Sequence, residues 1–265
     1  IAEHVRAHGD GVRDICFLVD DAEAAYDAAL ARGALPWRPP RVDTDGLGAV
    51  HHSAIRTYGE TVHTFLDRSA YTGEFAPGFG PPQLPAPGGP AVGLTRFDHI
   101  VANVEPGHLD QWVGYYEEVL GFYPLVHIDD DQISTEYSAL MSTVVWNHDK
   151  VVLPINEPAE GRRKSQIEEY LDFFGGPGVQ HLAMLTADIC ATVDELRRRG
   201  VRFLDTPDTY YEEAESRVGE IDKSWADVRR LKILADRDDD GYLLQIFSKP
   251  AQDRPTLFFE VIERH

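Results

Sequence analysis

Two stretches of the chain repeat the same alternation of apolar and polar positions. Residues 8–40 align without gaps to residues 175–207, which lie 167 positions later. In each stretch a glycine turn precedes a short apolar strand, and an Asp precedes an amphipathic helix that ends in Arg-Gly and is followed by an extended segment. The pattern predicts one βα unit used twice.

The remaining apolar runs predict strands, apart from one helix. Strand pairs with turn signals are expected over 50–68 and 231–249, where Asp-Gly before an apolar run indicates a hairpin. Single strands are expected over 95–104, 133–145, 150–158 and 256–263, and a helix is expected over 108–121. Residues 74–93 are crowded with Pro and Gly and lack any period, so they are predicted to form a linker.

These elements predict an α+β protein of two modules, each built from paired βαβββ repeats that form an open, curved, mixed β-barrel with helices outside. Residues 1–73 would be the second half of a first, non-catalytic module, and residues 94–265 a complete catalytic module. We expect that the front half of the first module, which an intact relative would have, is missing from the chain.

Composition narrows the function classes. The 265 residues carry a formal net charge of −20, and no basic stretch is dense enough to follow a phosphate backbone, so a nucleic-acid partner is not expected. No apolar run approaches the length of a membrane span, and no membrane partner is expected. Only two cysteines are present, which favours a reducing cytoplasm.

Two histidines stand on otherwise apolar strands. His181 would share one strand face with Val179, Ala183 and Leu185, while Asp14 occupies its place in the first copy. His99 stands early in the strand that opens the other half of the second module, 82 residues before His181. Equivalent places in two halves of a repeat predict a shared site that the first module lacks.

A carboxylate completes a candidate metal centre. Glu260 lies between Phe258 and Ile262 on one face of an apolar strand, where an ionised group is costly unless it is paired or bound to a metal. Two imidazoles and one carboxylate suit non-haem Fe(II) with open coordination positions. The alternative is that each histidine is a satisfied core residue and that Glu260 pairs with an arginine such as Arg254. The other histidines, His108, His127 and His148 among them, are expected at the surface.

The second module resembles the 4-hydroxyphenylpyruvate dioxygenases of the vicinal oxygen chelate superfamily. The segments that carry the resemblance are EYSALMSTVV, LPINEP, KSQIEEYL, GVQHLA, DTPDTYY, ADRDDDGYLLQIFSKP and QDRPTLFFEVIER. The first module is similar to the family's non-catalytic half. The resemblance implies that Fe(II) is the cofactor and that His99, His181 and Glu260 bind it.

The resemblance also implies a substrate pocket and a reaction. Ser142, Asn156 and Gln245 would be catalytic, and the substrate would contact Ser142, Asn156, Gln166, Gln180, Gln245, Phe247 and Phe258. On a regular strand Gln180 would point away from His181, and Gln166 would otherwise be a polar residue at a helix start. An aryl 2-oxo acid such as 4-hydroxyphenylpyruvate and O2 would give homogentisate and CO2 in tyrosine catabolism.

Two alternatives stay open at this point. A 4-hydroxymandelate synthase shares the fold, metal and substrate but oxidises the benzylic carbon, and Pro154 and Asn156 in LPINEP favour the dioxygenase. A non-redox, resistance-type binding protein of the same superfamily would hold no iron. Relatives are also expected to continue past His265 into a helix that closes the pocket, and a homo-oligomer is possible.

Overall fold

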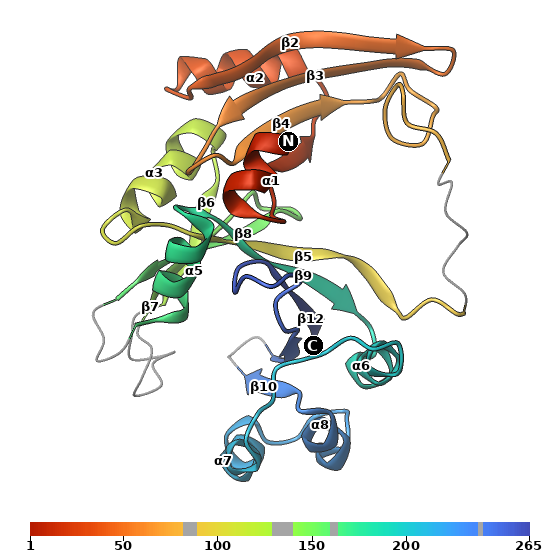
Figure 1. The fold of residues 1–265 in the computed structure, drawn as a ribbon, viewed down its shortest axis with the longest axis vertical. Coiled ribbons are helices and arrows are strands. Elements are labelled where there is room, and N and C mark those ends of the chain that lie inside the picture. Colours follow the sequence, from red (N-terminus) through yellow and green to blue (C-terminus); the bar gives the residue numbers. More distant parts are fainter. Residues whose placement is uncertain (82–88, 129–139, 160–163, 238–240) are drawn as a thin grey trace.

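The computed structural model describes residues 1–81, 89–128, 140–159, 164–237 and 241–265, which form two sheets with helices around them (Figure 1). The smaller sheet has the strand order β1-β4-β3-β2. Its strands are β1 (Asp14–Leu18), β2 (Pro36–Asp45), β3 (Gly48–Arg56) and β4 (Val62–Asp67). β1 and β4 run parallel, and the other pairs are antiparallel.

The larger sheet has the order β10-β11-β12-β9-β5-β8-β7-β6. Its strands are β5 (Leu94–Asn103), β6 (Tyr123–Ile128), β7 (Leu140–Trp146), β8 (Val152–Pro158), β9 (Gly178–Thr186), β10 (Leu234–Arg237), β11 (Tyr242–Phe247) and β12 (Phe258–Arg264). It is curled into a half-barrel, and the pairs β12·β9 and β5·β8 are parallel while the others are antiparallel. The predicted α+β class, with curved mixed sheets and external helices, is confirmed, whereas the domain boundaries stay a prediction.

The helices lie outside the sheets. They are α1 (Ala2–His8), α2 (Ala22–Ala31), α3 (Leu109–Leu120), α5 (Gln166–Phe174), α6 (Ile189–Arg198), α7 (Asp208–Val218) and α8 (Trp225–Leu231). In Figure 1, α2 lies against the smaller sheet, α3 and α5 flank one end of the larger sheet, and α6, α7 and α8 lie toward its other end. Among the described residues, no helix has both the length and the apolar character needed to cross a bilayer.

The predicted repeat is confirmed at its two helices. α2 and α6 begin and end 167 residues apart, as the alignment predicts. Each begins at an Asp whose side chain accepts hydrogen bonds from backbone amides of the first turn, Asp21 in α2 and Asp188 in α6. The first strand of each unit also corresponds, since β1 aligns with the second part of β9.

The two copies differ after the helix. In the first copy the predicted extended segment is the ten-residue strand β2. In the second copy only Phe203 makes a strand-like bridge, to Ser248, and the chain then forms α7 and α8. The extended segment predicted up to residue 207 thus forms no strand beyond this bridge, and α7 begins directly after it at Asp208. Tyr211, Ala214 and Val218 are buried at helical spacing in α7, and Tyr211 and Val218 belong to the core that α7 shares with α6, α8 and β11.

Two buried carboxylates fix the helices of the second module in the same way. Glu157, at the end of β8, accepts a hydrogen bond from the backbone amide of Leu109, the first residue of α3. Glu263, near the end of β12, does the same for Ile189, the first residue of α6. A carboxylate at a helix N-terminus satisfies a free amide and opposes the helix dipole. The two halves of residues 94–265 thus use the same device.

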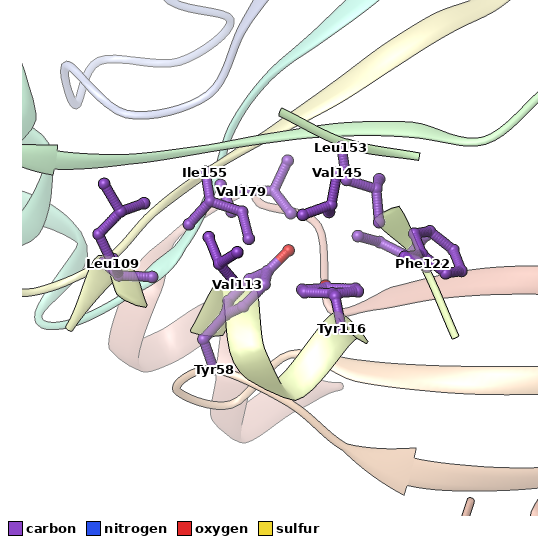
Figure 2. Packing of buried hydrophobic residues seen from close by; sticks show 12 residues of the cluster. Tyr58, Leu109, Val113, Tyr116, Phe122, Val145, Leu153, Ile155 and Val179 are labelled. Atoms are coloured by element: carbon purple, nitrogen blue, oxygen red, sulfur yellow. The ribbon is translucent and has the colours of Figure 1, made fainter. Parts of the chain in front are cut away.

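One of the two main cores lies between α3 and the outer face of the larger sheet (Figure 2). Val113 and Tyr116 of α3 point toward Val145, Leu153 and Ile155 of the sheet. Tyr58 and Ile15, which belong to the N-terminal part, join the same core. The two parts of the chain therefore share one hydrophobic core, and the opposite, concave face of the larger sheet is left for a site.

Some features of the fold differ from the sequence prediction. The helix α1 and the strand β6 were not predicted. The strand expected over 133–145 is seen from Leu140, and residues 133–139 lie outside the described residues, as do 82–88 of the linker. His108 and His148 are exposed as expected, and the side chain of His127 is not among those described.

The expectation that the other histidines lie at the surface is wrong for three of them: His4, His8 and His63 are buried. The side chain of His63 on β4 points into the core, and His8 of α1 stacks on Phe174 of α5.

Candidate metal centre

Three adjacent strands carry the candidate ligands. β12, β9 and β5 are neighbours in the sheet and bear Glu260, His181 and His99 respectively. Ala183 of β9 is paired with Glu260 on one side and with His99 on the other. Residues paired across strands point to the same face, so the three ligand candidates surround the small side chain of Ala183. A methyl group at this position leaves space between them.

The three side chains meet at one carboxylate oxygen. Glu260 Oε2 lies 3.2 Å from His99 Nε2 and 3.2 Å from His181 Nε2. Glu260 is 1% exposed, and its Oε1 has no hydrogen-bond partner among the described residues. Donor atoms bound about 2.1 Å from one ion stand roughly 3.0–3.4 Å apart. The spacing and the unpartnered buried oxygen fit a divalent cation.

Two β-bulges aim the histidines at this point. The pairing of β5 with β9 shifts between Phe97 and His99, where Asp98 is the extra residue. It shifts again opposite Gln180, because Val101 pairs with His181 while the next residue pairs with Val179. Each bulge therefore lies immediately before a ligand candidate. Bulges of this kind commonly re-aim side chains next to functional sites.

The second bulge corrects the face assigned to one residue. Val179 does not share a face with His181, since Val179 packs in the core under α3 while His181 stacks on Phe258 with ring centroids 4.8 Å apart. Gln180, which a regular strand would point away, instead reaches His181 and accepts a hydrogen bond from its Nδ1 at 3.1 Å. Strand alternation fails here because the bulge inserts one residue.

Each imidazole is held by the residue before it. His99 Nδ1 donates to Asp98 Oδ2 at 2.8 Å, as His181 Nδ1 does to Gln180 Oε1. Asp98 is fixed in turn by Arg264, whose Nε and Nη2 both bind its carboxylate. A donor bond at Nδ1 leaves the Nε2 lone pair free for a metal and fixes the ring orientation. Asp98 and Arg264 were not predicted, although Asp98 directly precedes His99 and Arg264 ends the quoted segment QDRPTLFFEVIER.

Burial and hydrogen bonding act in opposite directions on the pKa values of the three ligand candidates. Burial opposes the charged form of His99, but its hydrogen bonds to Asp98 and Glu260 outweigh burial and raise its pKa to about 9. Burial lowers the pKa of His181 below its ordinary value. Burial would raise the pKa of Glu260, but the hydrogen bonds from both imidazoles hold it lower. A proton on His99 Nε2 and a metal ion would therefore compete for the same place beside Glu260 Oε2.

Most of the predicted pocket residues lie on the same face as the ligand candidates. Ser142 of β7 and Asn156 of β8 are paired with each other and buried. Phe247 of β11 is paired with Glu260, and its ring lies 5.8 Å from that of His181. Gln245 shares the face of Phe247 by alternation. The concave face therefore combines the triad, two aromatic rings and several amide or hydroxyl groups.

Asn103 is a pocket candidate that sequence reasoning missed. It lies on β5, four residues after His99, and is paired with Asn156 of β8. Its side chain is fully buried, and neither amide atom has a partner among the described residues. An unsatisfied buried amide is costly, which is typical of a group that awaits a ligand. Its alternation with His99 along the strand was the available signal.

Two predicted residues lie apart from this cluster. Gln166 is the first residue of α5 and is exposed, and no hydrogen bond among the described residues joins it to the triad. Arg254, considered as a partner of Glu260, instead donates to the carbonyl of Ala7. The carboxylate of Glu260 is thus paired with the two histidines rather than with this arginine.

Comparison with known proteins places the chain in a family. Residues 96–246 match the family model of the Glyoxalase/Bleomycin resistance protein/Dioxygenase superfamily. A 4-hydroxyphenylpyruvate dioxygenase from Aspergillus fumigatus is 45% identical over 274 aligned positions, which cover 100% of this chain and 68% of that protein. The enzymes of the same name from Yarrowia lipolytica and Danio rerio are 43% and 44% identical, and each match covers 100% of this chain and 69% of the relative.

A solved structure supports the same placement. A mutant of 4-hydroxymandelate synthase from Streptomyces coelicolor superposes with a TM-score of 0.80 at 29% identity, covering 100% of this chain and 74% of that one. The identity to the dioxygenases is thus higher than the identity to this synthase. The sequence and the fold agree that the chain belongs to the 4-hydroxyphenylpyruvate dioxygenase family of the Glyoxalase/Bleomycin resistance protein/Dioxygenase superfamily.

Proposed function

We propose that this protein is an Fe(II)-dependent oxygenase that converts 4-hydroxyphenylpyruvate and O2 to homogentisate and CO2. The observation that carries the proposal is the meeting of two imidazole Nε2 atoms at one buried carboxylate oxygen, both at 3.2 Å. Its relatives, identical at 43–45% of positions over the whole chain, are named for this reaction. The proposed ligands are His99, His181 and Glu260.

The donor set suits Fe(II). Two neutral imidazoles and one carboxylate leave several coordination positions free for a bidentate 2-oxo acid and for O2. When bound, Fe(II) would supply the activation of oxygen and the redox chemistry of the reaction. The carboxylate offsets one positive charge, and Asp98 and Gln180 keep both Nδ1 atoms protonated so that Nε2 faces the metal.

The residues of the chain would bind and orient the substrate. Phe258 stacks on His181, and Phe247 lies edge-on to both rings, so together they form an apolar wall for an aromatic ring beside the metal. Ser142, Asn156 and Gln245 would hydrogen-bond the phenol or the 2-oxo acid from the same face. Gln180 would act on the metal through His181, and Gln166, at the exposed first position of α5, would contact the substrate from outside this cluster.

The exclusion of water is a further task of this face. The aromatic wall of Phe247 and Phe258 would keep solvent away from the reacting atoms of the substrate. Ring hydroxylation with migration of the side chain would require that the aromatic ring keep one position against Phe247 and Phe258 throughout the reaction. A tight aromatic contact provides that restraint.

An assay of O2 uptake and product identity distinguishes this reaction from two other functions. A 4-hydroxymandelate synthase would consume the same substrates, and a resistance-type binding protein would consume no O2. We expect O2 uptake on addition of Fe(II) and 4-hydroxyphenylpyruvate, with homogentisate identified by mass spectrometry. Hydroxymandelate as the product would contradict the dioxygenase, and the absence of O2 uptake would favour the binding protein. We further propose a role in tyrosine catabolism in the cytoplasm, consistent with the two unpaired cysteines.

A further inference from the structure

A second cluster of two histidines and one carboxylate is formed by residues that precede all three ligand candidates of the concave face in the sequence. The helix α1 carries His4 and His8 four residues apart, which places both on one side of the helix. Glu60 lies in the turn between β3 and β4 and points its Oε2 at both, 3.1 Å from His4 Nδ1 and 3.4 Å from His8 Nε2. Both histidines are buried, whereas the side chain of Glu60 is 53% exposed.

The hydrogen bonds of His8 leave one nitrogen facing the carboxylate. His8 Nδ1 donates to the backbone carbonyl of Phe174, at the end of α5, and the two rings stack with centroids 4.4 Å apart. A neutral His8 therefore carries its lone pair on Nε2, which is buried and has no hydrogen-bond partner among the described residues. This lone pair faces a carboxylate oxygen, and two acceptors at 3.4 Å repel each other unless a cation lies between them.

The hydrogen bond of His8 to a backbone carbonyl is also typical of a histidine that binds a metal. Such a histidine commonly donates one ring nitrogen to a carbonyl and binds the metal with the other. Two donor atoms bound about 2.1 Å from a tetrahedral ion stand roughly 3.4 Å apart, close to both measured separations. Within the described residues, His4, His8 and Glu60 form a group whose ligand atoms all lie within 4.8 Å of one another.

The turn that carries Glu60 is fixed in place. Gly59 has φ +57° and lies so close to Pro177 that an added Cβ would stand 2.3 Å from the Pro177 carbonyl oxygen. The turn therefore packs on the segment before β9 with no room for a side chain. The carboxylate is thus presented to the histidines by a close backbone contact.

We infer that His4, His8 and Glu60 form a second divalent-cation site that takes Zn²⁺. Two imidazoles and one carboxylate, with a water at the exposed side of Glu60, complete a tetrahedral zinc shell. Mg²⁺ and Ca²⁺ prefer all-oxygen shells and fit less well. The ion would join α1 and the β3–β4 turn, and through the His8 bond it would tie both to the C-terminus of α5.

The third such group does not need a metal. Asp222, Glu263 and His265 also lie close together, but Lys223 Nζ lies 3.0 Å from Glu263 Oε1 and already supplies a cation there. No lysine or arginine is ion-paired to Glu60 among the described residues. The contrast supports the choice of the His4 cluster.

Zinc uptake by the full chain tests the site. The variant His181→Ala removes the concave-face triad, so that any remaining stoichiometric zinc reports the second cluster. After chelator treatment, we expect this variant to bind one Zn²⁺ in a competition titration with a chromophoric chelator. Adding His8→Ala should weaken that binding beyond the ~10–100-fold that loss of an outer partner costs. His52→Ala is the matched control, because among the described residues His52 pairs with a single carboxylate, Asp43, and belongs to no group that could hold a metal. It should leave zinc binding unchanged.

Two outcomes would overturn the site. If the His181→Ala chain takes up no zinc, the cluster holds a proton only. If His8→Ala leaves zinc binding unchanged, the ion binds elsewhere. Should His8→Ala fail to fold, Glu60→Gln replaces the exposed carboxylate without changing its shape. With Co²⁺ as the probe, visible absorption typical of a tetrahedral ion should appear in His181→Ala and disappear when Glu60→Gln is added.

Discussion

The two clusters of two histidines and one glutamate differ in how deeply the carboxylate is buried. Glu260 is 1% exposed and stands on a central strand, whereas Glu60 is 53% exposed and stands in a turn. Both accept two imidazoles within 3.4 Å. Because an unpaired charge costs far more in the interior than at the surface, the inner cluster depends on its cation more strongly.

The supports of the histidines differ as well. In the inner cluster, side chains hold the Nδ1 atoms, Asp98 for His99 and Gln180 for His181. In the outer cluster, the backbone carbonyl of Phe174 holds His8. A side-chain support can carry charge and tune ligand basicity, while a carbonyl only orients the ring. The comparison suggests that the inner site is adapted to chemistry and the outer site to structure.

A matched pair of substitutions gives the largest expected difference between the clusters. Glu260→Gln should lower turnover more than roughly 10³-fold, since the iron that supplies the chemistry loses its one charged ligand. Glu60→Gln should leave turnover within about threefold, as expected of a polar substitution at an exposed position away from the chemistry. Oxygen uptake and iron content measured on both variants check the prediction. Equal losses would show that the two clusters act as one site.

A buried histidine outside both clusters, His63, shows what happens when both ring nitrogens are satisfied. His63 bonds the carbonyl of Ile15 and the hydroxyl of Tyr116, and burial lowers its pKa to about 4. The unfolded chain takes up this proton below about pH 6.5 but the folded chain only near pH 4, so stability is full above pH 6.5 and is lost as the pH falls to 4. The loss should be about 3 kcal/mol.

Urea unfolding at pH 7.5 and pH 4.5 measures that loss. His63→Phe should reduce the difference in unfolding free energy between the two pH values, while His52→Ala should leave it as in the parent chain. A His63→Phe variant with the same pH dependence as the parent would mean that His63 is not the group responsible.

Removal of a side-chain support should have a moderate effect on the inner cluster alone. Asp98→Asn keeps the shape but loses the charge that orients His99, and iron affinity should fall by about 10–100-fold. Zinc affinity at the outer cluster, measured in the His181→Ala background, should not change. Asp98→Asn also removes the ion pair between Asp98 and Arg264. Arg264→Met removes that ion pair alone and serves as the control. A smaller loss of iron affinity in Arg264→Met than in Asp98→Asn would show that Asp98 acts through its hydrogen bond to His99.

The smallest predicted effect concerns the space between the ligands. Ala183 lies between His99 and Glu260 in the strand register, and Ala183→Val adds two methyl groups there. Overpacking of about 1–2 kcal/mol should weaken iron binding roughly tenfold while all three ligands remain. Met184→Leu, on the opposite face, is the control. Unchanged iron affinity in Ala183→Val would place the ion away from this methyl group.

The sequence predicted several parts of the fold and site for local reasons. The helices α2 and α6 follow from apolar spacing and from the capping residues Asp21 and Asp188, which act within one turn. The candidate ligands stood out because a polar group on an apolar strand is costly. Both signals are carried by neighbouring residues, so they can be read without a structure.

Other features could not be read in this way. The face of Val179 and the reach of Gln180 depend on a bulge that exists only once β9 pairs with β5. The cluster of His4, His8 and Glu60 joins a helix to a turn more than fifty residues away. The helix α7 continues a segment whose counterpart in the first copy is a strand, because a different core is available to it.

By itself, the sequence determined which side chains could bind a metal and on which strands they stand, since residue type and periodicity are local properties. Only the tertiary structure decided that three of them meet at one oxygen, that the residues before the histidines hold their Nδ1 atoms, and that a second cluster forms at α1. The physical reason is that strand order, register and bulges arise from pairing between distant segments, which no single segment encodes.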